Sequence, residues 1–176
     1  MTTAAAQVPR AKFIEDVNSY MKGKEVDQVL MQMQSQLREY KVMESKVLME
    51  VRRLSTKLPD LQRNLDMVKL LMDKNGEEVK ADFQLADHVF AKSSIQDPQG
   101  VMLWLGADVM LEYPLAEAKE LLEAQVAKCK EQMEEMRAAL DVVKDQVTTT
   151  EVAIARIYNY DVEARRAAKE KEGEAS

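Results

Sequence analysis

The side chains that could carry out chemistry are few and lie far apart in the sequence. The chain has one histidine, His88, and one cysteine, Cys129. A protein zinc site needs three or four such ligands, and a nucleophilic cysteine needs a base beside it. His88 falls in a stretch typical of β-strand, whereas Cys129 falls on a helical seam. We therefore interpret His88 as a surface or interface side chain and Cys129 as a small core residue.

Carboxylate pairs and hydroxyl runs give no catalytic site either. Glu134 and Glu135 have lysine and arginine neighbours at helical spacing, which is typical of a solvated helix face. Thr148, Thr149 and Thr150 could be modified, but β-branched residues at a seam more often adjust packing. The glycine-rich motifs GxxxxGK[ST] and GxGxxG, which hold nucleotide phosphates, are absent from the sequence. These features predict a protein that is not an enzyme and that uses no cofactor or metal.

The composition predicts long helices with few turns. Only 5 glycines and 4 prolines interrupt 176 residues, and charged residues reach 32% against 5% aromatic, a balance typical of coiled coils. The formal net charge is -6, with basic residues interleaved among acidic ones, which argues against a nucleic-acid partner. No run approaches the roughly 18 apolar residues of a membrane span. One cysteine and no apolar leader predict a reducing setting, cytosolic or nuclear, of which we favour the cytoplasm.

Two long segments carry the heptad pattern of a coiled coil. In the first arm, residues 25–80, apolar side chains recur every three or four residues from Leu30 to Met72. The phase continues past Pro59, which should kink this helix without ending it. The second arm, residues 115–166, carries a weaker and more polar seam of equal length. The two segments therefore predict the antiparallel arms of one helical hairpin.

Residues 81–114 change from a helical period to an alternating one. The stretches LADHVFA and LGADVML each place a small residue and an aspartate in mid-strand, which predicts a bend that divides each stretch in two. Two β-hairpins would result, and isolated hairpins are marginal in water and leave edges free to pair. We predict that they join other chains in a closed barrel through Phe83, Leu85, Val89, Val101, Leu103, Leu105, Val109 and Leu111. The alternative is a cap that folds back on the chain's own coiled coil.

The remaining segments lie outside the arms. Residues 1–12 and 167–176 have small or charged side chains without periodicity, which predicts disordered tails. In residues 13–24, the apolar side chains of FIEDVNSYM form one stripe of a short amphipathic helix, and Gly23 begins a link to the first arm.

Three motifs together match a known family. They are FIEDVNSYM, then GADVMLEYP before the second arm, and DQVTTTEVAIARIYNYDVEARR near its end. On these motifs, residues 13–166 resemble the α-class subunits of prefoldin. The resemblance implies a mainly α fold with a small β part: a long antiparallel coiled-coil hairpin, with two β-hairpins at its base that join a multi-subunit β-barrel.

The resemblance also implies a function. Prefoldin is a hexameric, ATP-independent co-chaperone of two α-class and four β-class subunits, whose coiled-coil tips capture non-native actin and tubulin chains and pass them to the cytosolic chaperonin. The competing hypothesis is a coiled-coil scaffold or tether that dimerises and binds a fixed partner. A scaffold needs only the rods, whereas two hairpins serve a closed barrel.

Holding unfolded chains requires adaptable apolar surface, for which methionine is suited because its thioether is flexible and polarisable. The chain has 12 methionines, several of them early in the first arm. Met33 lies on the seam and is better explained as coiled-coil core. Met31 lies off the seam and flanks it. We expect client contact at the distal ends of the arms through Phe13, Ile14, Val17, Tyr20, Met21, Met31, Ile154, Ile157 and Tyr158.

Overall fold

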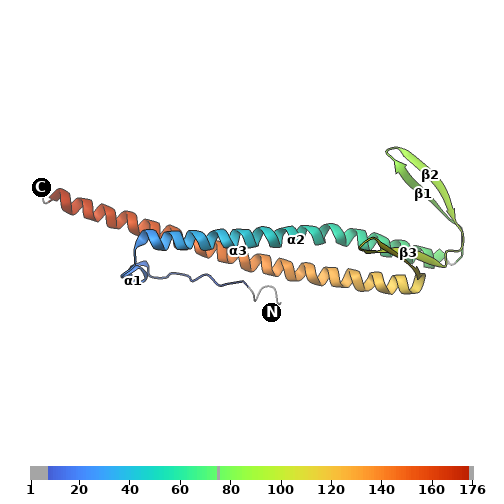
Figure 1. Cartoon of the computed structure of the whole chain (residues 1–176), viewed down its shortest axis with the longest axis horizontal. Helices are drawn as coiled ribbons and strands as arrows, with labels where there is room; N and C mark the ends of the chain where they lie inside the picture. The colour runs from blue at the N-terminus through green and yellow to red at the C-terminus, as the bar shows by residue number, and fades with distance from the viewer. Residues whose placement is uncertain (1–7, 75, 175–176) are drawn as a thin grey trace. The chain divides into compact units, whose positions relative to one another are not determined.

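Two long helices and two β-hairpins make up the fold (Figure 1). A computed structural model describes residues 8–74 and 76–174. The elements, in chain order, are α1 (Val17–Met21), α2 (Val26–Lys74), β1 (Val79–Ala86), β2 (Val89–Ile95), β3 (Gly100–Gly106), β4 (Val109–Pro114) and α3 (Leu115–Glu174). The predicted fold class, mainly α with two antiparallel hairpins joined to a coiled coil, is confirmed.

The chain divides into two compact units, and both long helices contribute to each. Unit 1 comprises Met1–Arg52 and Glu134–Ser176, and unit 2 comprises Arg53–Met133. Within each unit α2 and α3 lie side by side and antiparallel. In the part of the chain that the structure describes, no helix is long and apolar enough to cross a membrane.

The long helices follow from their seams and end where the local chemistry changes. α2 continues through Pro59, whose ring removes one backbone donor from a helix that packing elsewhere supports. It ends at Lys74, just before Gly76, which has a φ of 88°, a conformation that glycine adopts without strain. α3 extends to Glu174, beyond the expected end of the second arm at residue 166. The added segment is rich in Ala, Glu and Lys, which are strong helix formers.

In unit 2 the apolar seams of the two helices meet. Leu54 from α2 and Ala118, Leu122 and Cys129 from α3 are among its buried residues. The Cys129 Sγ lies 3.9 Å from the carbonyl oxygen of Leu54, which agrees with a core role for this thiol. An exposed ion pair, Lys69 Nζ to Glu123 Oε1 at 3.1 Å, also bridges the helices.

The two hairpins have the same construction. β1 pairs with β2 and β3 pairs with β4, as two separate antiparallel sheets. In each hairpin the register shifts shortly before the turn. The extra residue of the resulting bulge is Leu85 in β1 and Leu105 in β3. The turns use left-handed residues, with φ values of 65° at His88 and 50° and 58° at Ala107 and Asp108, as tight hairpins require. The expectation that His88 lies in a strand is therefore wrong, because it lies in the β1–β2 turn.

Candidate functional site

The β1–β2 hairpin has one apolar face and one face that is polar except for Phe90. Directly opposed residues of an antiparallel pair project to the same side of the sheet. One face carries the opposed pairs Val79 and Ile95, Ala81 and Ser93, and Phe83 and Ala91. The other carries Lys80 and Ser94, Asp82 and Lys92, and Gln84 and Phe90. A sheet of this kind can cover an apolar interior on one side and face water on the other.

The β3–β4 hairpin, in contrast, has apolar side chains on both faces. One face carries the opposed pairs Val101 and Tyr113, and Leu103 and Leu111. The other carries Met102 and Glu112, and Trp104 and Met110. Trp104 is 61% exposed in the single chain. A strand pair that is apolar on both sides is typical of a sheet buried on both sides.

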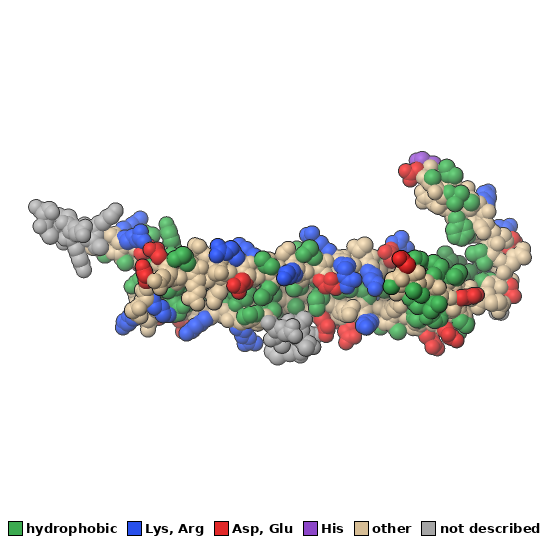
Figure 2. All heavy atoms as spheres, in the orientation of Figure 1, with side chains coloured by type: hydrophobic (Ala, Val, Ile, Leu, Met, Phe, Trp, Pro, Cys, Tyr) green, Lys and Arg blue, Asp and Glu red, His purple; other side chains and the backbone are tan. Residues whose placement is uncertain are grey.

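Most of the predicted assembly residues are uncovered in the single chain. Val101 and Leu103 are half-buried, and the exposed ones are Phe83, Leu85, Val89, Leu105, Val109 and Leu111. Sequence reasoning missed Phe90, Met102, Trp104 and Met110, which are also exposed. Figure 2 shows hydrophobic side chains gathered over the hairpins. Exposed apolar patches of this kind mark interaction surfaces.

Within unit 2 the β3–β4 hairpin borders a cavity of about 550 Å³ beside the coiled coil. Trp104, Leu105 and Gly106 line one side, and Leu54, Leu61 and Cys129 are among the helical residues that line it. Cys129 is buried and His88 lies in a hairpin turn, so the two do not form a catalytic pair. Among the residues that the structure describes, no cluster of His, Cys, Asp or Glu could hold a metal ion.

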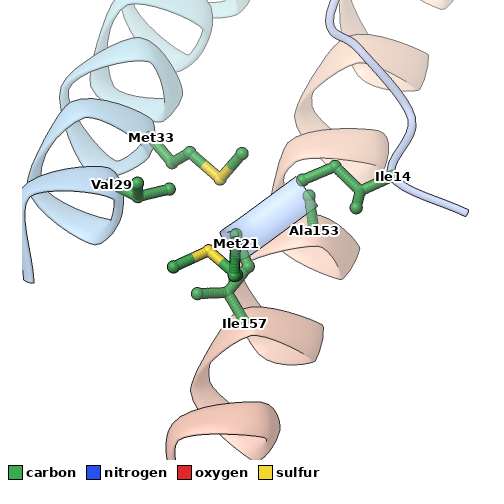
Figure 3. Packing of buried hydrophobic residues seen from close by; sticks show 6 residues of the cluster. All are labelled: Ile14, Met21, Val29, Met33, Ala153 and Ile157. Atoms are coloured by element: carbon green, nitrogen blue, oxygen red, sulfur yellow. The ribbon is translucent and has the colours of Figure 1, made fainter. Parts of the chain in front are cut away.

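The predicted client-contact residues lie in unit 1 and divide into buried and exposed sets. Ile14, Met21 and Ile157 are buried in a cluster with Val29, Met33 and Ala153 (Figure 3). Val17, Tyr20 and Ile154 are partly buried against that cluster. The exposed ones are Phe13, Met31 and Tyr158.

The expected single stripe on a helix from Phe13 to Met21 is wrong in its first part. α1 begins only at Val17, where the Asp16 carboxylate accepts a hydrogen bond from the Asn18 backbone N–H at 3.0 Å as an N-cap. Phe13 and Ile14 precede the helix, so tertiary contacts and not a helical stripe decide their orientation. Ile14 turns into the core, whereas Phe13 remains exposed beside the Arg156 guanidinium, 5.4 Å from the ring centroid.

The described part of the expected N-terminal tail follows the coiled coil in unit 1. The Tyr40 hydroxyl donates to the Pro9 carbonyl oxygen at 3.1 Å, and the Ala11 N–H donates to Gln146 Oε1 at 2.8 Å. Arg156 Nη1 donates to the Ile14 carbonyl oxygen at 2.6 Å. Residues 9–14 therefore have a defined path, and residues 1–7 lie outside the described part of the chain.

The Tyr40 contact makes the docking of this segment sensitive to alkaline pH. Burial, with a smaller effect from the Glu39 carboxylate, raises the pKa of Tyr40 above its ordinary value of 10.0. The folded protein thus holds the phenolic proton more tightly than the unfolded chain, so this stabilisation is complete below about pH 10 and is lost as pH rises through the folded pKa.

Replacing Tyr40 with phenylalanine should lower the free energy of unfolding by about 1 kcal/mol at neutral pH, because one hydrogen bond is lost. It should also remove part of the alkaline loss of stability. Urea unfolding of wild type and variant, compared near neutral pH and above about pH 10, measures both effects. An identical alkaline loss in the two proteins would contradict the assignment.

Comparisons with known proteins find a family model and relatives that match most of the chain. The sequence matches the family model "Prefoldin subunit" over residues 40–160. It is 36% identical to the probable prefoldin subunit 3 of Dictyostelium discoideum, over 94% of this chain and 85% of that protein. Prefoldin subunit 3 of Mus musculus is 39% identical, over 90% and 83% of the two chains. A structure of filamentous PFD from Methanocaldococcus jannaschii aligns with a TM-score of 0.46 and 19% identity, over 74% of this chain and 95% of that one.

Proposed function

The chain belongs to the prefoldin subunit family, and from that premise we propose that it is an α-class subunit of a hexameric co-chaperone. The complex contains two α-class and four β-class subunits, and it works in the cytoplasm without ATP. It captures non-native actin and tubulin chains and transfers them to the cytosolic chaperonin. The relatives named prefoldin subunit 3 support the corresponding position in the complex for this chain.

One observation carries the assembly part of this proposal: two hairpins expose large apolar side chains in the single chain. A two-stranded hairpin is marginal alone, and its free edges and apolar faces favour pairing with other chains. The β1–β2 hairpin, with one polar face, suits a barrel wall with water outside. The β3–β4 hairpin, with two apolar faces, suits a position covered on both sides. Partner subunits supply these covers.

Client holding takes place in unit 1 through weak apolar contacts. Phe13, Met31 and Tyr158 make the direct contacts, because their side chains are exposed. Val17, Tyr20 and Ile154 border them, and Ile14, Met21 and Ile157 become accessible only when α1 leaves its cluster. Disordered clients lose conformational entropy when held. Several weak contacts from several subunits compensate for this loss, because the first contact raises the effective concentration of the client at the others.

Replacing Phe13, Met31 and Tyr158 with serine should weaken the holding of denatured actin by the assembled complex about threefold or more, since each buried apolar side chain contributes on the order of 1.5 to 3 kcal/mol and only one of the six subunits is changed. Suppression of actin aggregation at graded concentrations of the complex measures the effect. The matched control replaces Val42, Met49 and Val152, which are also exposed side chains of unit 1. Full suppression by an intact complex that carries the first set of substitutions would refute these contacts.

A further inference from the structure

An apolar groove between α2 and α3 in unit 1 is filled by the chain's own N-terminal segment, residues 9–21. Val29 and Met33 project from α2, and Ala153 and Ile157 from α3 (Figure 3). Ile14 and Met21 insert between them, and each is only 4% exposed. The N-terminal segment thus occupies the groove as a bound peptide would.

Among the residues that the structure describes, three hydrogen bonds from α2 and α3 reach the main chain of this segment. Tyr40 donates to the carbonyl of Pro9, Arg156 donates to the carbonyl of Ile14, and Gln146 accepts from the N–H of Ala11. Main-chain groups are common to every polypeptide. The groove therefore combines contacts that do not depend on sequence with two apolar positions that accept large aliphatic side chains. This is the chemistry with which an unfolded chain can be recognised.

The N-terminal segment is held weakly enough to dissociate from the groove. α1 has 5 residues, far below the length at which an isolated helix is stable in water, so its helix depends on docking. It joins α2 through Gly23, which has a φ of 73° and no neighbour within 4 Å of the position that a Cβ would take. A short element tied by few hydrogen bonds opens at a lower free energy than the helices beneath it.

We propose that this groove is a binding surface for short amphipathic segments of unfolded clients, and that residues 9–21 are a built-in competitor for it. The inference rests on the proposed function and adds a specific surface, a client chemistry and a control on affinity. Because the groove is free only in the fraction of molecules with the segment released, the apparent client affinity is reduced by that fraction.

The groove is tested first without any client. The probe is a fluorescent peptide with the sequence of residues 9–24, and the protein is the assembled complex in which the full chain carries Ile14→Asp and Met21→Asp, which release the intramolecular segment. We expect this complex to bind the peptide at least tenfold more tightly than the wild-type complex. A peptide carrying the same two aspartates is the matched control and should not bind. Equal binding of the wild-type peptide by both complexes would overturn the proposal.

A second pair of substitutions closes the groove. Ile14 and Ala153 belong to one buried cluster, so cysteines are placed at both positions to tie the segment down by a disulfide. Mass spectrometry of the oxidised complex verifies that the disulfide has formed. The oxidised complex should bind neither the peptide nor denatured actin at the groove, and reduction of the same sample should restore both. The single variant Ile14→Cys, oxidised in parallel, controls for the treatment.

Client competition separates the inference from the function on which it rests. Denatured actin should displace the peptide from the released complex, and that complex should hold actin several-fold more tightly than wild type. If the wild-type complex holds actin but the actin neither displaces the peptide nor responds to release or closure of the segment, the inference fails and the proposed function stands. If the wild-type complex does not hold actin, the proposed function fails. The proposal that unfolded clients occupy the groove then fails as well.

Discussion

Replacing Leu103 or Trp104 with aspartate should remove the chain from its complex, even though these neighbouring side chains project to opposite faces of the β3–β4 hairpin. Both faces of this hairpin are apolar. On our account both faces are covered after assembly, and burial of an unpaired carboxylate costs several kcal/mol. A loss of more than about 100-fold in the affinity of the chain for its partner subunits is therefore expected from each change.

The β1–β2 hairpin should respond differently, because its faces differ in polarity. Phe83→Asp places a charge on the apolar face and should prevent assembly, whereas Gln84→Asp lies on the polar face and should be tolerated. Co-expression with the partner subunits, followed by affinity capture and size-exclusion chromatography, measures the fraction of chain in the complex. The account of the faces fails if Leu103→Asp assembles as wild type does, or if Gln84→Asp disrupts assembly as strongly as Phe83→Asp does.

The second large effect is expected in the core of unit 1. Ile157 is fully buried, at 0% exposure, and packs in the cluster that also holds Ile14 and Met21. Its replacement by alanine should lower the free energy of unfolding by about 2 to 5 kcal/mol, through lost burial and the cavity that remains. The neighbouring Tyr158 is 58% exposed, so Tyr158→Ala should change the free energy of unfolding by only about 0.5 kcal/mol.

Urea unfolding followed by helical circular dichroism distinguishes these two variants. Limited proteolysis gives an independent readout, because loss of the Ile157 side chain should also free residues 13–21 for cleavage while Tyr158→Ala leaves them protected. Equal stability of the two variants would show that the cluster does not hold unit 1 together.

The helices and hairpins were accessible from the sequence because each is encoded by a local period. Spacing of three and four residues marks the seams, and Leu54, Leu122 and Cys129 are buried as a seam requires. The paired motifs LADHVFA and LGADVML marked the two hairpin turns. The continuous run VMLWL also encodes the apolar character of both faces of β3–β4, but alternation of polar and apolar residues around the run masks this signal.

The N-terminal segment could not be predicted in the same way. A helix of 5 residues is too short to show a period, and the burial of Ile14 depends on α3, which is far away in the sequence. The position of His88 could not be predicted because this residue adopts a left-handed φ of 65° in a turn without glycine, whereas a glycine marks the bend of the second hairpin. The end of α3 was placed too early because charged, small residues favour both tails and exposed helices.

The native mass and composition of the particle that carries the tagged chain test the central claim most directly. We predict a particle of six small subunits, two α-class and four β-class, from which a chain lacking residues 83–113 is absent. A monomer or homodimer whose assembly does not depend on those residues would contradict the account and favour a coiled-coil scaffold.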